Sequence, residues 1–203
     1  MIEAVDISKR YRDHDVLESF HASIETNSLT VITGESGKGK TTLLNILSLL
    51  ERPDRGTVTI DAISDPSPKQ ILNLRRHTIS YLFQNYGLID EYTVEKNLRV
   101  SLTYRKDPGP SVSEALAQVG LEGYEKRKVY ELSGGEQQRV ALARILLKDA
   151  HYIFADEPTG NLDKGNRDVV IKLLRGLADS GKGVILATHD LDLLSYADQH
   201  IHL

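Results

Sequence analysis

A glycine-rich run that we call the phosphate loop (residues 34–41) combines the residue types that bind a phosphorylated nucleotide. Its glycines allow backbone N–H groups to turn toward a phosphate. A helix beginning behind it would add free amides and the positive end of its dipole. Lys40 is placed to reach the β- and γ-phosphates of ATP, and the Thr41 hydroxyl is placed to bind Mg²⁺. Taken alone, the pattern predicts an NTPase or a kinase. The residues expected to contact ATP here are Gly34, Glu35, Ser36, Gly37, Lys38, Gly39, Lys40, Thr41 and Thr42.

Two carboxylates, Asp156 and Glu157, follow an apolar run that extends from His151 to Ala155. A buried strand that ends in acids places them at the carboxyl edge of a sheet, where the phosphate loop of such a fold also lies. Asp156 is suited to hold Mg²⁺, directly or through water, and Glu157 is suited to polarise an attacking water. The alternative is a strand that ends in a solvated acidic turn.

His189 and Gln84 also follow predicted strands, at 184–188 and 79–83. His189 could contact a γ-phosphate and hold the attacking water in line, although its position alone leaves a structural role equally open. The Gln84 amide could reach Mg²⁺ or water, and its position alone is a weak indication. The other six histidines are interpreted as structural.

The segment from Leu132 to Arg139 reads LSGGEQQR. Ser133 and Glu136 have the spacing of a capping box at a helix start. Two consecutive glycines weaken such a start unless another group must approach the backbone closely. A serine and bare amides at a helix N-terminus form an anion site. The sequence therefore predicts a second phosphate-binding device.

Strands and helices alternate along the chain, which predicts a parallel sheet covered by helices on both faces. Residues 86–132 are predicted to be mainly helical and to form an inserted α-helical subdomain. The fold class is therefore α/β, a P-loop NTPase core with a mainly parallel sheet, an N-terminal antiparallel β portion and this insert. Strands are predicted at 2–7, 16–24, 29–33, 57–60, 79–83, 152–155, 184–188 and 200–203, helices at 41–50, 70–76, 135–147, 165–179 and 191–197, and a loop at 61–69.

The composition is that of an ordinary globular protein, with 203 residues, 40% hydrophobic and 27% charged. A net charge of −4 argues against a broad basic surface for nucleic acid. The lack of cysteine excludes disulfides and thiolate metal sites. We find no signal peptide and no apolar run long enough to cross a bilayer. Any action on a membrane is therefore expected to need a partner chain.

The order and content of these motifs resemble the ABC ATPase family, and the LSGGEQQR string is similar to that family's signature motif. The resemblance covers nearly the whole chain and implies a single ABC ATPase domain over 1–203. In this family the signature of one subunit closes over the ATP bound by the other, and two subunits enclose two ATPs head to tail. The resemblance thus implies a partner's nucleotide as the ligand of the second anion site.

The resemblance also implies roles for individual residues. Tyr11 is similar to the aromatic residue that stacks on adenine, and Asp163 to the residue that joins the two sites. Gln84, with Thr41 and Asp156, is implied at Mg²⁺, and His189 and Gln84 join Glu157 as the implied catalytic residues. The contacts made to the partner's ATP are implied for Ser133, Gly134, Gly135 and Asp163.

Two stretches are similar to particular branches of the family. Residues 155–163, ADEPTGNLD, resemble the ATPases of lipoprotein release, macrolide export and cell division. Residues 83–89 resemble ATPases linked to export of bacteriocins or antimicrobial peptides. Lys38 departs from the family pattern, which has a small residue there. Our hypothesis is that Glu35 neutralises Lys38 or that Lys38 adds charge near the γ-phosphate.

The resemblance implies an ATP-binding and ATP-hydrolysing subunit of an ABC transporter. It would use ATP and Mg²⁺ and dimerise with a second copy. It would drive export through an integral membrane permease, lying in the cytoplasm at the inner face of the cell membrane. No nucleic-acid partner is expected, because DNA-repair, chromosome and translation members usually carry a long coiled coil or a second cassette. An ATPase that moves a membrane partner in signalling or cell division, without cargo, stays an alternative.

Overall fold

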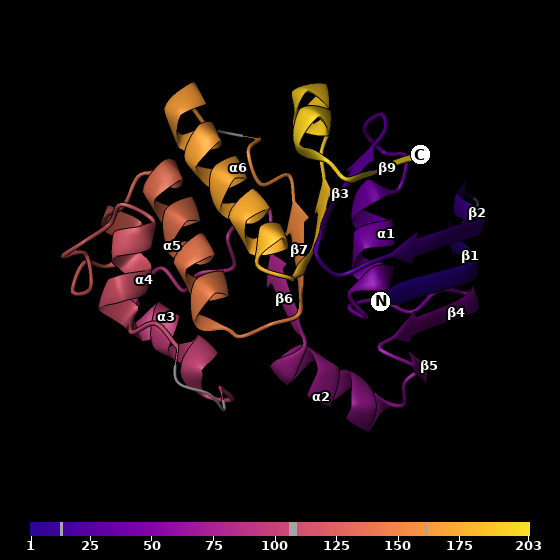
Figure 1. Ribbon diagram of the computed structural model, residues 1–203, viewed down its shortest axis with the longest axis horizontal. Coiled ribbons are helices and arrows are strands. Elements are labelled where there is room, and N and C mark those ends of the chain that lie inside the picture. The colour runs from indigo at the N-terminus through magenta and orange to yellow at the C-terminus, as the bar shows by residue number, and fades with distance from the viewer. Residues whose placement is uncertain (13, 106–108, 161) are drawn as a thin grey trace.

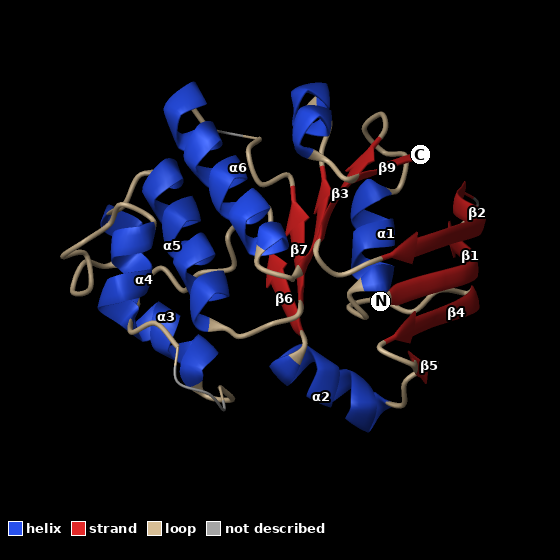
Figure 2. Ribbon diagram, viewed as in Figure 1, coloured by secondary structure: helices blue, strands red, loops and turns tan. Residues whose placement is uncertain are grey.

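A computed structural model describes residues 1–12, 14–105, 109–160 and 162–203 of the chain. Asn161, which belongs to the ADEPTGNLD string, lies outside the described residues. Within them, two β-sheets and a set of helices form one layered molecule (Figures 1 and 2). No helix of the described part is both long and apolar enough to cross a membrane.

The larger sheet confirms the predicted parallel core. Its five strands run in the order β6-β7-β8-β3-β9, and every recorded pairing between them is parallel. All residues of β3, β7 and β8 are buried, as expected of strands covered on both faces. The strands are β3 (Ser28–Thr33), β6 (Ile79–Leu82), β7 (Tyr152–Asp156), β8 (Gly183–Ala187) and β9 (Gln199–His202).

The smaller sheet is antiparallel and lies at the right of Figure 1, beside α1. Its order is β2-β1-β4-β5, which confirms the predicted antiparallel β portion. Residues 61–69 are not all loop, because Ile63–Ser64 pair with β4. The strands are β1 (Ile2–Tyr11), β2 (His14–Ile24), β4 (Arg55–Ile60) and β5 (Ile63–Ser64).

The helices follow the predicted order with shifted ends. The predicted helix at 41–50 ends earlier, at Leu47, because Ser48 caps it and Leu49 has a positive φ of 59°. The predicted short helix near 191–197 is a 3₁₀ helix. The helices are α1 (Lys40–Leu47), α2 (Pro68–His77), α3 (Val94–Leu102), α4 (Val112–Gln118), α5 (Gly134–Leu147) and α6 (Lys164–Asp179), with 3₁₀ helices η1 (Val129–Glu131) and η2 (Leu191–Tyr196).

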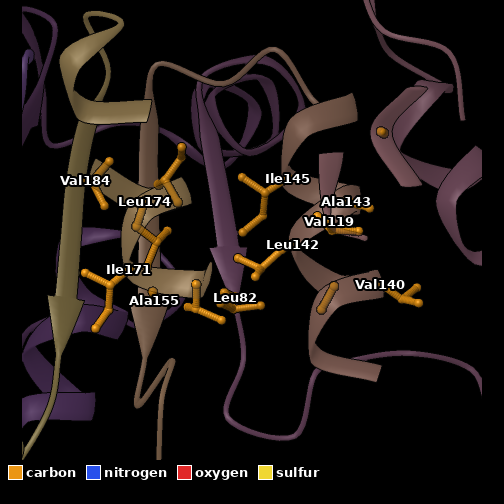
Figure 3. Close-up of a cluster of buried hydrophobic side chains, with 14 of the residues drawn as sticks. Leu82, Val119, Val140, Leu142, Ala143, Ile145, Ala155, Ile171, Leu174 and Val184 are labelled. Atoms are coloured by element: carbon orange, nitrogen blue, oxygen red, sulfur yellow. The ribbon is translucent and has the colours of Figure 1, made fainter. Parts of the chain in front are cut away.

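Two hydrophobic clusters cover opposite faces of the parallel sheet. Ile153 and Ala155 of β7 belong to the cluster shared with α3 to α6, whereas Tyr152 and Phe154 belong to the cluster shared with α1 and the antiparallel sheet. This alternation follows from the period of two in a strand. Figure 3 shows side chains of the first cluster meeting between the sheet and the two long helices. Each fully buried large apolar side chain contributes about 1.5–3 kcal/mol to folding.

Residues 86–132 contain α3, α4 and η1, joined by long connections. Their buried residues, such as Leu98 and Leu116, belong to the same cluster as Val140 of α5 and Leu82 of the sheet. The segment therefore shares its core with the rest of the molecule. Its status as an inserted subdomain stays a prediction.

Candidate functional site

The phosphate loop connects β3 to α1, which is the predicted strand-loop-helix arrangement. Gly39 is the residue before α1 and has a φ of 92°. A Cβ atom there would lie 2.5 Å from Cγ1 of Val16 on β2. Only glycine satisfies both the left-handed backbone and this close approach. The loop is thereby pressed against the antiparallel sheet, with the N-terminus of α1 behind it.

Lys40 turns its side chain back over the loop. Its ammonium donates hydrogen bonds to the carbonyl oxygens of Gly34, at 2.8 Å, and Glu35, at 3.0 Å. The residue is only 9% exposed, although it carries a charge. The positive charge is therefore fixed at the loop itself, where the phosphates of a nucleotide would need it.

Thr41 and Asp156 form an oxygen-rich pair across the site. The Thr41 hydroxyl lies 3.1 Å from Oδ1 and 3.0 Å from Oδ2 of Asp156. The pKa of Asp156 is raised overall, first by burial and also by the charge of Glu157. The hydrogen bond from Thr41 and the charge of Lys40 act in the opposite direction. Hydroxyl and carboxylate oxygens are ligands that Mg²⁺ prefers. The pair thus fits the metal site implied by the sequence.

The protein supplies few further ligands at this place. Among the described residues, no three His, Asp or Glu side chains gather where they could hold a metal ion. Mg²⁺ usually binds through one or two protein groups together with substrate phosphates and water. The donor set of Thr41 and Asp156 is therefore of the kind that holds Mg²⁺ only together with a nucleotide.

Glu157 follows β7 and has a positive φ of 46°, which is uncommon for a residue other than glycine. Three contacts hold it there. Its N–H donates to Ala187 O at 2.9 Å, its Oε2 accepts from the Thr188 hydroxyl at 3.2 Å, and its Oε1 lies 2.9 Å from Nδ1 of His189. Glu157 and His189, which the sequence placed after separate strands, are thus direct neighbours. A strained backbone held by its surroundings is typical of functional sites.

Two adjoining cavities surround these groups. The larger, of about 370 Å³, lies between Tyr11, the phosphate loop, Gln84 and Glu157. The smaller, of about 290 Å³, lies between Gln84, Glu157 and His189. Ser36, Gln84 and Glu157 line both. The structure therefore brings most of the predicted ATP contacts and the predicted catalytic residues to one place, whereas Gly34, Glu35 and Lys38 line neither cavity.

Tyr11 forms one wall of the larger cavity. Its hydroxyl donates to Oε1 of Glu51 at 2.5 Å, and the ammonium of Lys9 lies 5.4 Å from the centre of its ring. The residue is 43% exposed. An exposed ring anchored at its hydroxyl is available for stacking on a flat ligand.

The capping box predicted at Ser133 is present at the start of α5. The carboxylate of Glu136 accepts from the Ser133 N–H at 2.8 Å and from its hydroxyl at 2.9 Å. Tyr124 donates to the same carboxylate at 2.9 Å, and Arg127 lies 3.9 Å from it. The hydrogen bonds from Ser133, foremost the backbone one, lower the pKa of Glu136. The helix start is thus held in a fixed shape.

Residues 133–135, which we call the Ser133 segment, do not line either cavity, and neither does Asp163. Ser133, Gly134 and Asp163 are exposed. Asp163 caps the start of α6 by accepting from the N–H of Asn166 at 3.0 Å. The residues expected to contact a partner's nucleotide are therefore exposed or half-exposed and do not line the cavities of their own chain.

Glu35 and Lys38 are both exposed, and the structure records no ion pair between these two described side chains. Their recorded contact is the backbone bond from the Lys38 N–H to Glu35 O at 3.3 Å. This geometry does not support neutralisation of Lys38 by Glu35. Added positive charge near the phosphates stays a hypothesis.

Two residues of the site were missed from the sequence. Thr188 is fully buried and donates to Glu157, but nothing in its pattern distinguishes it from other strand residues. Gln138 is buried, donates to Pro158 O and lines the smaller cavity. Its place in LSGGEQQR was a signal, although it was assigned no role.

Comparisons with known proteins agree with this geometry. The family described as ABC transporter matches residues 17–160. A protein of Bacillus subtilis named ABC transporter ATP-binding protein YxdL is 36% identical over all of this chain and 83% of its own length. A protein of Hyphomonas neptunium named macrolide export ATP-binding/permease protein MacB is 37% identical over all of this chain and 33% of its own length. The chain thus spans about a third of the macrolide-export relatives it matches.

Two solved structures are similar over the whole chain. The dimeric structure of MJ0796, described as a bacterial ABC transporter cassette, has a TM-score of 0.91, 32% identity and 94% coverage of its own chain. A dimeric post-hydrolysis state of MJ0796 bound to ADP and Pi has a TM-score of 0.90, 31% identity and the same coverage.

Proposed function

This chain belongs to the ABC transporter family of ATP-binding cassettes, and from that premise we propose that it powers export through a separate membrane permease by closing head to tail on ATP with a second copy of itself. Members of this family are ATPases, and this chain has their cassette fold. We propose three further features: a role in export, association with a second copy of this chain, and a membrane permease as partner.

One observation carries the proposal. The chain has a cavity with a phosphate loop and the Glu157–His189 pair, and a separate, exposed anion-binding segment at the start of α5. Within one chain the Ser133 segment lines neither cavity. A second chain turned head to tail brings the Ser133 segment of each copy onto the cavity of the other. Dimers of the similar cassette MJ0796 support this arrangement.

We assign the ATP-binding role to the residues of the larger cavity. Tyr11 stacks on the adenine, and the phosphate loop with Lys40 and Thr42 holds the phosphates. When bound, Mg²⁺ neutralises charge on the β- and γ-phosphates. Thr41, Asp156 and Gln84 are the residues that would hold it.

We assign the hydrolytic role to Glu157 and His189. The Glu157 carboxylate accepts a hydrogen bond from the attacking water and orients it toward the γ-phosphate. His189, at 2.9 Å from that carboxylate, fixes its direction and reaches toward the phosphate. Ser133, Gly134, Gly135 and Asp163 complete the site from the second copy.

The permease is proposed from relatives. The relative from Hyphomonas neptunium is named as both ATP-binding protein and permease, and this chain matches a third of it. A membrane partner would place the cassette at the inner face of the cell membrane. Vesicles that contain this chain and a permease shown to bind it should accumulate cargo only with ATP and an intact Glu157. Accumulation that is equal with Glu157→Gln would exclude this cassette as the motor.

The dimer is tested with Glu157→Gln. The amide keeps the shape of the carboxylate but is a poor base, so hydrolysis should fall about 100-fold or more while ATP binding persists. Size-exclusion chromatography with light scattering should show a monomer without nucleotide and a dimer with ATP and Mg²⁺. ADP serves as the control, and with ADP the protein should remain a monomer. A monomer at saturating ATP, with binding confirmed, contradicts closure by this chain alone.

A further inference from the structure

The first turn of α6 connects three parts of the site that are far apart in sequence. Asp163 caps this helix, and the next residues in the turn with recorded side-chain contacts are Asn166 and Arg167. Both α5 and α6 begin at the end of the molecule where β7 and β8 finish (Figure 1). The Ser133 segment contacts this turn through Gly135, and residues 188–190 after β8, which we call the His189 loop, contact it through Asp190.

Asn166 contacts both Asp163 and α5. Its side-chain amide donates to Oδ2 of Asp163, and its Oδ1 accepts from the guanidinium of Arg139. A Cβ atom at Gly135 would lie 3.3 Å from Nδ2 of Asn166. The second glycine of the Ser133 segment therefore packs directly against this amide.

The helix cap does not need the Asn166 side chain. Asp163 caps α6 through the backbone N–H of residue 166, at 3.0 Å, which any residue except proline supplies. The side chain of Asn166 thus serves the contact between the two helices. Arg139 donates to Asn166 through its guanidinium, whereas its buried Nε has no hydrogen-bond partner among the described residues.

Arg167 extends the same turn to the loop that follows β8. Its guanidinium lies 2.8 Å from Oδ2 of Asp190, which follows His189, and 3.3 Å from Oδ2 of Asp192. The Arg167 side chain is 25% exposed, and so is that of Asp190. The backbone N–H of Arg167 donates to Asp163 O at 2.9 Å. The His189 loop is thereby tied to Asp163.

We infer that Asn166 and Arg167 are positioning residues that hold the Ser133 segment and the His189 loop of one subunit in a fixed relation to Asp163. The inference rests on the proposed head-to-tail dimer. In that dimer the Ser133 segment serves the partner's ATP, whereas His189 serves the subunit's own. Through a rigid link between them, the nucleotide bound at one site changes the geometry of the other site. The two ATPs should therefore be hydrolysed cooperatively.

The test compares Asn166→Ala and Asn166→Asp with the wild type. Alanine removes both side-chain bonds. Aspartate keeps an acceptor for Arg139 but places a like charge beside Asp163. The wild type should hydrolyse ATP with a Hill coefficient near 2, the limit for two sites, and Asn166→Ala with one near 1 and a roughly tenfold lower kcat. Asn166→Asp should lose cooperativity as well, because the link to Asp163 is broken.

Two readouts separate positioning from a structural role. The ATP affinity of the monomer should stay within about twofold and Tm should fall by no more than about 5 °C, because the cap is retained and the Arg139 bond is the main loss. Arg175→Ala is the matched control. It breaks contacts to Asp179 and Asp198 at the other end of α6 and should leave the Hill coefficient unchanged.

Each outcome decides the inference. A wild-type Hill coefficient and kcat in Asn166→Ala would overturn it while leaving the dimer intact. A large fall in Tm with normal cooperativity in the surviving protein would make Asn166 structural and also overturn it. If the wild type itself neither dimerises with ATP nor shows cooperativity, the proposed function fails first and the inference fails with it.

Discussion

Glu157 shows how much positioning a single residue requires. Its backbone stays at a φ of 46° because Ala187 O and the Thr188 hydroxyl hold it. The hydrogen bond from Thr188 also directs the carboxylate from the side opposite His189. Hydrolysis slows when the carboxylate that orients the attacking water is free to change direction.

Thr188→Val should therefore slow hydrolysis without weakening ATP binding. Valine has nearly the same shape but removes two hydrogen bonds of the Thr188 hydroxyl, the one it donates to Glu157 and the one it accepts from the Asp190 N–H at 3.1 Å. The bond to Glu157 is worth about 1 kcal/mol, so we expect kcat to fall about fivefold. Steady-state kinetics and nucleotide titration measure the two effects. Thr30→Val is the control, because Thr30 of β3 is equally buried but bonds to Gln199. Equal losses of kcat in both variants would contradict the assignment.

Lys148 is a half-buried cation outside the nucleotide site. Burial, and then the charge of Arg144, lowers the pKa of Lys148 to about 8. Between that value and the unfolded value of 10.5, the unfolded chain binds more protons than the folded chain. The free energy of unfolding therefore rises with pH across this window.

Wild type should accordingly gain stability relative to Lys148→Met between pH 8 and pH 10.5. Urea denaturation at several pH values measures the difference. Lys9→Met is a control of opposite sign. Burial lowers the pKa of Lys9, but Glu51 and Asp54 outweigh it and raise the pKa overall. The contribution of Lys9 to the free energy of unfolding is therefore present below pH 10.5 and lost at higher pH. If the stability difference from wild type changed with pH in the same way for Lys148→Met and Lys9→Met, the assigned pKa directions would be wrong.

At the scale of elements, the start of α5 combines two tasks. Ser133 caps the helix with Glu136, and it is also the residue proposed to meet the partner's ATP. The same capping box occurs at α4, where Ser111 pairs with Glu114. Neither Ser111 nor Glu114 lines the nucleotide cavities. The chain thus contains its own matched control.

Ser133→Ala and Ser111→Ala should each lower the free energy of unfolding by about 1 kcal/mol, the usual effect of losing a cap. In the Glu157→Gln background, only Ser133→Ala should also weaken the ATP-dependent dimer, measured by light scattering. Loss of the dimer in both variants would show that stability alone governs association.

Local patterns predicted those elements whose cause is local. Ser133 and Glu136 of the capping box are three residues apart, so the sequence alone predicted this box. The glycines of the phosphate loop are likewise close to one another in sequence and were predicted in the same way. The strand Ile63–Ser64 was missed because it exists only through pairing with β4. Thr188 was missed for the same reason, since its role depends on a contact with Glu157 31 residues away.

For the whole molecule, the parallel sheet is a shared wall between two hydrophobic clusters. The cluster in Figure 3 joins β6, β7 and β8 to α5 and α6 and also contains the buried residues of α3 and α4. Helices on this side carry the Ser133 segment and Asp163, whereas α1 on the other side carries Lys40 and Thr41. The packing on the two faces of the sheet therefore sets the distance between the phosphate loop and the Ser133 segment within one chain.

Leu142→Ala should destabilise the molecule by about 2–5 kcal/mol, the range for a large-to-small change in a core. Leu142 is fully buried between α5 and the sheet. Urea denaturation measures the loss, and the native protein should still bind ATP. Val100→Ala is the control at a 59% exposed position and should change stability by less than about 0.5 kcal/mol. Similar losses would contradict the assigned core.

The separation of the Ser133 segment from the cavity has a genetic consequence. In a pair of identical copies, each substitution is inherited by both sites at once. A copy lacking Lys40 and a copy lacking Ser133 carry different defects, which can complement each other. In the proposed head-to-tail pair, one site would combine the sound phosphate loop of the second copy with the sound Ser133 segment of the first. Two inactive alleles expressed together are then expected to restore one working site per mixed pair.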